Sequence, residues 1–173
     1  FAKKHDGAFV LRIEDTDQNR SVKGAEAYIM NALEWLGITP DEGPSTNGRY
    51  GPYRQSERKE FYVNHINELV RSGTAYVAFD TAAELAHMRS RAEAKGETFS
   101  YNWKNRSALK NSFSQSPEET QKLIERGVPH VIRFKTFSEN DNRFLSLQDD
   151  VRGKLEIDLS LLDDKILVKQ DGM

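Results

Sequence analysis

The stretch that decides the fold is AFVLRIEDTDQNR, residues 8–20. Its first six residues form a short, mainly apolar run after Gly7, a pattern typical of a buried strand in an α/β sheet. From Val22 to Leu36 the apolar residues fall on one helical face, and Gly37 ends this helix. A strand followed by a helix predicts a βα unit. The acidic residues between the two lie at the strand end where α/β sheets bind ligands.

Further elements follow from the same patterns. We expect a helix from Ser56 to Gly73, helices opened by capping boxes at 81–84 and 116–119, and strands at 75–79, 130–135, 144–147, 155–159 and 165–169. Residues 82–135 carry 10 basic and 6 acidic side chains, whereas acidic residues prevail on either side. We therefore expect a parallel-sheet core in residues 1–80. A smaller α+β module is inserted at 81–160, and residues 161–173 form a return strand to the core.

Composition excludes several classes of protein. The 173 residues include 25 basic and 27 acidic side chains, so the chain as a whole is not a basic nucleic-acid-binding protein. The absence of cysteine excludes disulfides, thiolate zinc sites, iron–sulfur clusters and cysteine nucleophiles. No apolar run approaches the ~18–20 residues of a membrane span. Because the chain opens on Phe1 and closes just after a strand-like run, we expect it to be part of a longer protein.

The acidic loop allows two interpretations besides a ligand site. Asp15, Asp17, Asn19 and Glu26 match positions 1, 3, 5 and 12 of an EF-hand calcium loop. Arg20, however, stands where that loop needs glycine, and the segment entering the loop is strand-like, so calcium binding is disfavoured. The simpler interpretation is that the acidic side chains form turns and cap the following helix. The four histidines lie in different elements and predict no metal site.

The basic side chains of residues 89–110 also leave two interpretations open. They are Arg89, Arg91, Lys104, Arg106 and Lys110, and aromatic residues stand among them. Such a set is typical of a surface for single-stranded nucleic acid, where guanidinium groups take phosphates and rings stack on bases. It is equally typical of a solvated polar loop over a small core.

Six ordered stretches together resemble a known family. They are LRIEDTDQNR (11–20), EWLGITPDEGP (34–44), GPYRQSER (51–58), GTAY (73–76), VIRFK (131–135) and DDKILVKQDGM (163–173). In this order they are similar to glutamyl-tRNA synthetases of the bacterial or organellar type. Glutaminyl relatives carry Phe-Asp-Asp-Thr-Asn where this chain has IEDTD at 13–17. The nearest alternatives are a paralogue that glutamylates the queuosine base of tRNA(Asp) and a non-catalytic RNA-binding module.

The resemblance implies a fold and a reaction. The fold is α/β, a partial class I Rossmann-type catalytic core with an inserted α+β domain that binds the tRNA acceptor stem. The reaction activates glutamate with ATP, with Mg²⁺ on the phosphates, and transfers it to the 3′ end of tRNA(Glu). The family's ATP-binding motifs should lie before Phe1 and after Met173. We therefore expect this chain to contain no catalytic residue, to be inactive alone, and to belong to a cytoplasmic monomer.

The resemblance also assigns residues. Glu14 stands where the family places a carboxylate close to the α-amino group of glutamate. Asp17 and Arg20 stand where the acceptor end of the tRNA approaches, and four more positions fall on or near the acceptor-stem face: Arg89, Arg133, Arg152 and Lys169. Some members bind zinc through a Cys-x-Cys pair, but the corresponding positions here are Ala78-Phe79-Asp80. The resemblance therefore predicts no zinc.

Overall fold

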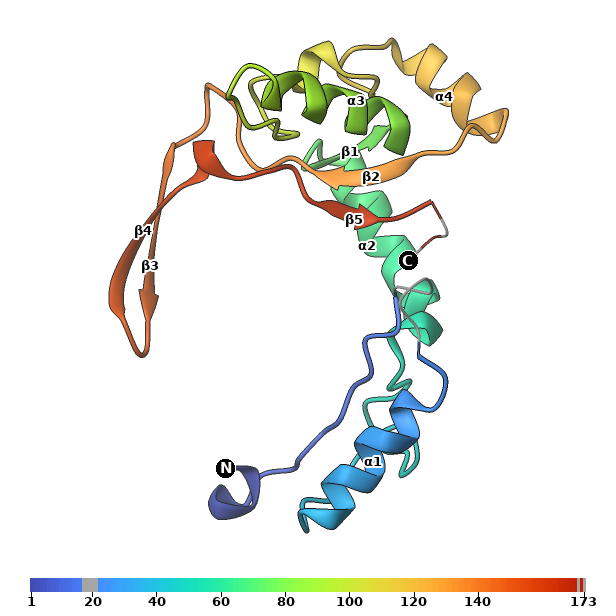
Figure 1. The fold of residues 1–173 in the computed structure, drawn as a ribbon, viewed down its shortest axis with the longest axis vertical. Helices are drawn as coiled ribbons and strands as arrows, with labels where there is room; N and C mark the ends of the chain where they lie inside the picture. Colours follow the sequence, from blue (N-terminus) through green and yellow to red (C-terminus); the bar gives the residue numbers. More distant parts are fainter. Residues whose placement is uncertain (17–21, 171, 173) are drawn as a thin grey trace. The chain divides into compact units, whose positions relative to one another are not determined.

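The computed structural model describes residues 1–16, 22–170 and 172 (Figure 1). The chain divides into two compact units, unit 1 at Phe1–Asn64 and unit 2 at His65–Met173. Unit 1 holds α1 (Ala25–Trp35) and two short 3₁₀ helices, Ala2–His5 and Gln55–Arg58. The next helix, α2 (Lys59–Arg71), begins in unit 1 and ends in unit 2.

In unit 1 the stretch 8–13 is extended but pairs at only two points. Val10 bridges Glu42 and Ile13 bridges Arg54, both in the parallel sense. The Ile13 amide donates to the Tyr53 carbonyl at 2.8 Å, and the Leu11 amide donates to the Glu42 carbonyl at 2.9 Å. The expected direction of pairing is therefore present. The stretch 8–13 does not form a continuous strand, because its two bridges, to Glu42 and to Arg54, are isolated.

The loop between these bridges is closed by a buried tyrosine. Tyr53 is 6% exposed, and its hydroxyl donates to the carboxylate of Glu42. Gly48 lies against both, since a Cβ there would come within 2.5 Å of the tyrosine hydroxyl and 2.6 Å of the glutamate side chain. A residue without a side chain is therefore required at Gly48. The contact fixes the loop that delivers Arg54 to the site.

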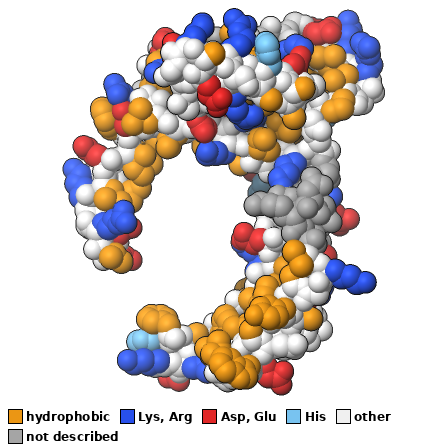
Figure 2. Space-filling view, in the orientation of Figure 1, with side chains coloured by type: hydrophobic (Ala, Val, Ile, Leu, Met, Phe, Trp, Pro, Cys, Tyr) orange, Lys and Arg blue, Asp and Glu red, His pale blue; other side chains and the backbone are white. Residues whose placement is uncertain are grey.

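Helix α1 confirms the predicted helix of residues 22–36, yet it buries none of its residues within unit 1. Apolar side chains gather on the surface around it (Figure 2). Tyr28 is 77% exposed and Trp35 is 84% exposed. Most helices in proteins are stabilised by packing of an apolar face. In the described part of unit 1, α1 instead relies on its loop and ion-pair contacts.

Unit 2 is built on a three-stranded antiparallel sheet in the order β1–β2–β5. The strands are β1 (Ala75–Ala78), β2 (Val131–Phe134) and β5 (Ile166–Val168). The first strand was expected in the parallel core of residues 1–80, and the last was expected to return there. Both instead pair with β2, from Ala75 opposite Phe134 to Ala78 opposite Val131 and from Ile132 opposite Val168. By its contacts, the division of the chain therefore falls near residue 65.

Two helices and an irregular segment complete the core of unit 2. Helix α3 (Ala82–Glu93) opens with the predicted capping box, in which Thr81 and Glu84 bind each other's backbone amides. Helix α4 (Pro117–Glu125) opens with Ser116, whose side chain accepts from the amide of Glu119. The segment between the helices, residues 96–115, supplies Tyr101 and Leu109 to the core cluster with Tyr76 and Leu85. This segment is thus part of the core and not a solvated loop.

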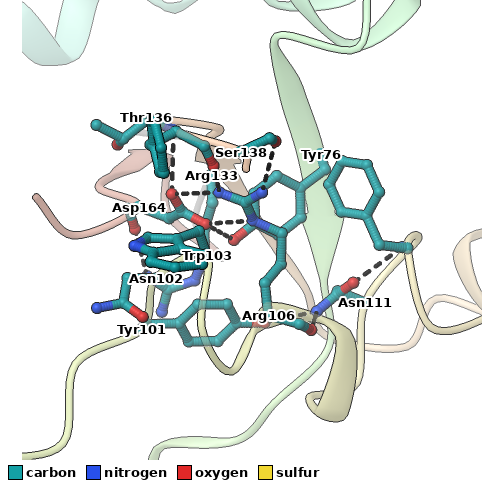
Figure 3. Close-up of polar contacts among 12 residues, drawn as sticks. Tyr76, Tyr101, Asn102, Trp103, Arg106, Asn111, Arg133, Thr136, Ser138 and Asp164 are labelled. Atoms are coloured by element: carbon teal, nitrogen blue, oxygen red, sulfur yellow. Dashed lines mark hydrogen bonds and ion pairs between the residues drawn. The ribbon is translucent and has the colours of Figure 1, made fainter. Parts of the chain in front are cut away.

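A polar network anchors this irregular segment to the sheet (Figure 3). Arg106 and Asp164 are 7% and 1% exposed, and they form a bidentate ion pair at 2.6 and 2.9 Å. The same carboxylate accepts from the Tyr76 hydroxyl at 2.6 Å and from the Thr136 amide at 3.0 Å. All four lone-pair directions of the aspartate are therefore used. A carboxylate with so many hydrogen-bond donors fixes the chain around it.

A two-stranded hairpin forms a separate sheet in unit 2 (Figure 1). It joins β3 (Phe144–Asp149) to β4 (Gly153–Asp158), with Leu147 opposite Leu155. The side chain of Asp149 closes the tip of the hairpin, because its carboxylate accepts hydrogen bonds from the backbone amides of Val151 and Arg152. Both predicted strands are confirmed.

Across the described residues, no helix has the length and apolar character needed to cross a membrane.

Candidate functional site

Unit 1 contains a cleft of about 790 Å³ where the stretch 11–15 meets the start of α1. Its walls come from three segments of the chain: the end of the extended stretch, the first turns of α1, and the residue after Tyr53. The charged residues among its lining are Arg12, Glu14, Asp15, Lys23, Glu26 and Arg54. The cleft therefore lies at the carboxyl end of the extended stretch, where the sequence predicted a ligand site.

Arg54 links the loop to the helix across the cleft. Its Nε and Nη2 donate to the two carboxylate oxygens of Glu26 at 2.9 and 2.6 Å, and its Nη1 donates to Glu57 at 3.1 Å. The hydrogen bonds from Arg54 lower the pKa of Glu26 and those carboxylates raise the pKa of Arg54. A planar guanidinium held in this bidentate way has little rotational freedom. The pair therefore fixes the first turn of α1 beside the cleft.

Asp15 is hydrogen-bonded to Ser56, which lies two residues after Arg54 in the chain. Its carboxylate accepts hydrogen bonds from the amide and the hydroxyl of Ser56. Burial alone would raise the pKa of Asp15, but the hydrogen bonds from Ser56 outweigh it and lower the pKa. Asp15 is thus an ionised capping group for the 3₁₀ turn that begins at Gln55. The sequence predicted that the acidic side chains cap the following helix, but α1 has no side-chain cap at its N-terminus, and Asp15 instead binds a turn 41 residues along the chain.

Glu14 has a different environment. Among the described residues its carboxylate pairs with Arg12 at 2.7 Å, and the side chains of Glu14 and Arg12 are 66% and 53% exposed. Exposed ion pairs of this kind contribute about 0–1 kcal/mol. Among the carboxylates lining the cleft, Glu14 is consequently the one least committed to the fold. Its exposed carboxylate is accessible to an incoming ammonium group.

The other predicted site residues lie in several places. Asp17 and Arg20 fall outside the described residues. Arg152 lies at the tip of the hairpin, and Lys169 follows β5. The remaining two, Arg89 and Arg133, line one cavity of about 310 Å³ in unit 2. The structure therefore brings one pair of the predicted residues together, and it places Glu14 in the cleft.

The burial of Arg133 does not follow from the pattern of its strand. The sequence predicts a strand at 130–135, and within it Arg133 is 7% exposed. Its guanidinium lies 3.9 Å above the ring of Tyr101, and its Nη1 donates to the carbonyl of Asp164 at 2.8 Å. The irregular segment 96–115 covers this face of the sheet, which explains the burial.

Sequence reasoning missed two ion pairs that shape these sites. The Arg54–Glu26 pair joins residues 28 apart, and the Arg106–Asp164 pair joins residues 58 apart. No local spacing rule relates residues so far apart. For Arg106, which was considered as part of an exposed nucleic-acid surface, both open interpretations are wrong, because its side chain is buried on Asp164. Lys110, from the same set, pairs with Glu84.

Comparisons with known proteins agree on one class. The family described as tRNA synthetases class I (E and Q), catalytic domain, matches residues 1–173. Glutamate–tRNA ligases of Christiangramia forsetii and Flavobacterium johnsoniae are 56% and 54% identical to the chain over 173 residues. These matches cover 100% of the chain and 34% of each relative, so the chain spans about a third of their length.

Solved structures give the same result. The glutamate–tRNA synthetase of Elizabethkingia anophelis superposes with a TM-score of 0.93 at 49% identity, over 100% of this chain and 34% of that one. A glutamate tRNA ligase from Elizabethkingia meningosepticum, solved in complex with its amino acid, gives a TM-score of 0.92 at 49% identity with the same coverage. The chain belongs to the class I tRNA synthetases for glutamate and glutamine, within their catalytic domain. The curated and solved relatives described here are all of the glutamate type.

Proposed function

We propose that this chain forms part of a glutamate–tRNA ligase, supplying one wall of the glutamate site and the region that binds the tRNA acceptor stem. In the proposed reaction a carboxylate oxygen of glutamate attacks the α-phosphate of ATP, and pyrophosphate leaves. A ribose hydroxyl at the 3′ end of the tRNA then attacks the acyl carbon, and AMP leaves. Neither step needs a protein nucleophile. Catalysis of this kind depends on positioning and on charge stabilisation.

The observation that carries the proposal is the state of Glu14 in the cleft. Asp15 is held by Ser56 and Glu26 by Arg54, whereas the partner of Glu14 among the described residues is the exposed Arg12. An amino-acid substrate carries an ammonium group, which needs an anion beside it. A charge-assisted hydrogen bond of this type contributes roughly 1.5–3 kcal/mol. Glu14 is therefore the group we assign to the α-ammonium of glutamate.

The contacts of Glu26 and Asp15 favour Glu14 as the carboxylate that binds the ammonium group. The guanidinium of Arg54 neutralises Glu26, and the donors of Ser56 satisfy Asp15, so neither carboxylate competes strongly for the ammonium. The Arg54–Glu26 pair also holds the first turn of α1 beside the cleft. The ATP is bound by residues outside this chain under our proposal, as the sequence resemblance implies.

Magnesium enters this proposal only through ATP. Among the described residues, no group of three His, Cys, Asp or Glu side chains lies close enough together to hold a metal ion. Mg²⁺ in nucleotide sites is bound largely by phosphates and water, with one or two carboxylates. The described residues are compatible with Mg²⁺ that is bound to the phosphates of ATP, where the ion would neutralise phosphate charge.

The acceptor-binding part of the proposal rests on unit 2 and on the hairpin. Arg89, Arg133, Arg152 and Lys169 are the residues we assign to RNA, together with Asp17 and Arg20 of the acidic loop. Arg152 lies on the exposed hairpin tip and Arg89 on the exposed side of α3. Arginine suits this role because its planar fork pairs with phosphate oxygens. The inserted-domain role of residues 81–160, the monomeric state and the cytoplasmic location belong to the same proposal.

The test is aminoacylation by the full-length protein that carries this chain. With labelled glutamate, ATP and tRNA, we expect label on the tRNA that mild base removes. A tRNA lacking its terminal adenosine should accept no label. Label on this shortened tRNA would instead indicate the queuosine-modifying paralogue. Binding of tRNA without any transfer of glutamate would favour a non-catalytic RNA-binding module.

A further inference from the structure

The residue before Glu14 is hydrogen-bonded through both of its backbone groups to one loop, residues 53–56. The Ile13 amide donates to the Tyr53 carbonyl at 2.8 Å. The Gln55 amide donates in turn to the Ile13 carbonyl at 2.9 Å. Both hydrogen bonds join main-chain atoms, so they fix the path of the backbone independently of the side chains. The backbone that leads into Glu14 is therefore held on this loop.

The residue after Glu14 is held by the same loop through side-chain atoms. The carboxylate of Asp15 accepts hydrogen bonds from the Ser56 amide at 2.8 Å and from the Ser56 hydroxyl. Hydrogen bonds to an ionised group are roughly twice as strong as those between neutral groups. Ser56 is thus the residue that ties the backbone after Glu14 to the loop.

The burial of side chains alternates along this stretch. Leu11, Ile13 and Asp15 are half-buried, whereas Arg12 and Glu14 are exposed. This alternation is typical of extended backbone, in which successive side chains point to opposite faces. Because the loop holds the residues on either side of Glu14, it also determines which face the Glu14 carboxylate occupies. Glu14 lines the cleft described above.

The loop has anchors of its own. Arg54 forms a bidentate pair with Glu26, and Nη1 of Arg58 donates to the Pro52 carbonyl at 2.9 Å. These contacts do not involve the hydroxyl of Ser56. Removal of that hydroxyl should therefore leave the loop in place and weaken only its contact with the neighbouring stretch.

We propose that Ser56 is a positioning residue for amino-acid binding, which holds Asp15 on the loop so that Glu14 presents its carboxylate to the ammonium group of the substrate. This inference rests on the function proposed above, because it requires Glu14 to bind that ammonium group. Ser56 itself does not touch the substrate. Its effect passes through Asp15 to the adjacent residue, so it depends on the charge of Glu14 and on the ammonium group of the ligand.

The first experiment measures ligand binding to the full-length protein and to its Ser56→Ala variant by calorimetry. Residues of one hydrogen-bond network are energetically coupled, so we expect glutamate affinity to fall about threefold to tenfold. Binding of glutarate and of ATP should be unchanged, because neither carries an ammonium group. Ser45→Ala is the matched control, since it removes an exposed serine hydroxyl from the same unit, and it should bind glutamate like the parent protein. An unchanged glutamate affinity in Ser56→Ala, or an equal loss for all three ligands, would overturn the proposal.

A second variant and a kinetic measurement separate positioning from a general loss of structure. Ser56→Thr keeps a hydroxyl and should restore most of the glutamate affinity. In aminoacylation by the full-length protein, Ser56→Ala should raise the KM for glutamate by the same factor and leave kcat and the KM for ATP unchanged. This is the pattern expected when binding is weakened equally in the ground state and the transition state. A lower kcat with an unchanged KM for glutamate would contradict the proposal.

The final experiment combines Ser56→Ala with Glu14→Gln. The double variant should bind glutamate as weakly as Glu14→Gln alone, because the carboxylate whose position Ser56 controls is absent. Additive losses would show that Ser56 acts independently of Glu14 and would refute the inference. If Glu14→Gln weakens glutamate binding and Ser56→Ala does not, the inference fails and the proposed function stands. If Glu14→Gln has no effect, the role proposed for Glu14 fails and the inference fails with it.

Discussion

Replacing Asp164 by asparagine should destabilise unit 2 more than any other single isosteric change in its polar network. Each carboxylate oxygen of Asp164 accepts two hydrogen bonds, one from Arg106 and one from Thr136 or Tyr76. An amide places an NH₂ donor where one of these oxygens stood, facing the donors that it must satisfy. The variant also leaves the charge of Arg106 buried at 7% exposure with no ionic partner.

The expected magnitude follows from the burial of both partners. Removing one partner of a buried ion pair costs about 3–5 kcal/mol, whereas an exposed pair contributes about 0–1 kcal/mol. Asp163→Asn is the matched control, because this neighbouring carboxylate is 43% exposed and pairs with a lysine that is 76% exposed. We therefore expect a difference of several kcal/mol between substitutions at adjacent positions.

The assay is native-state hydrogen exchange of the β1, β2 and β5 amides, which reports opening of this unit inside the full-length protein. A loss of 3–5 kcal/mol speeds exchange by about two to three and a half powers of ten. The double variant Arg106→Met with Asp164→Asn should recover much of the loss, since no buried charge is then stranded. The reasoning is refuted if Asp164→Asn lowers the opening free energy of unit 2 by less than about 1 kcal/mol. It is also refuted if the effects of Arg106→Met and Asp164→Asn simply add in the double variant.

Two further predictions concern the capping and bridging contacts. Arg54→Lys should lose the bidentate bond to Glu26 and so lower the stability of the first turn of α1 by about 1 kcal/mol. Amide exchange in this turn should then be about fivefold faster, whereas Glu57→Gln should change the exchange rate little. Lys110 and Thr81 lower the pKa of Glu84 to about 2, from an ordinary value of 4.5. This stabilisation of α3 is therefore complete above about pH 4.5 and is lost as the pH falls toward 2. Exchange in α3 followed against pH should show that loss, and a Glu84→Gln protein with the same pH dependence would contradict it.

Local signals predicted the helices and their starts. Thr81 and Glu84 have the spacing of a capping box, and the structure shows both of its hydrogen bonds. Short strands were likewise predicted at 144–147 and 155–159, and the structure pairs β3 with β4 there. These features succeed because the interacting residues are close in sequence and the physics that joins them is local.

Long-range pairing was not predictable in the same way. The stretch 8–13 has the composition of a buried strand, yet its two bridges to Glu42 and Arg54 are isolated. A strand needs a neighbour along its whole length, and periodicity does not reveal which neighbour is present. Strand β1 was similarly assigned to the wrong sheet by its sequence position, because its partner, β2, lies more than fifty residues further along the chain.

The candidate sites were predictable only in part. Glu14 was placed by resemblance, and the structure locates it in a cleft at the predicted end of the extended stretch. Arg54, which shapes that cleft, was recognised only as a member of a loop, because its partner Glu26 is in another element. The strand that carries Arg133 was predicted, but the burial of Arg133 was not. Its burial depends on the irregular segment 96–115, whose packing has no periodic signature.

The most direct test of the central claim is the binding of glutamate to the full-length protein and to its Glu14→Gln variant, measured by calorimetry alongside the binding of ATP. The account predicts that glutamate binding weakens by about tenfold to a hundredfold, since a charged contact of roughly 1.5–3 kcal/mol is lost. ATP binding should stay unchanged. Glutarate, which lacks the amino group, should bind both proteins equally. Equal losses for glutamate and ATP, or no loss for glutamate, would contradict the assignment of Glu14 to the substrate ammonium.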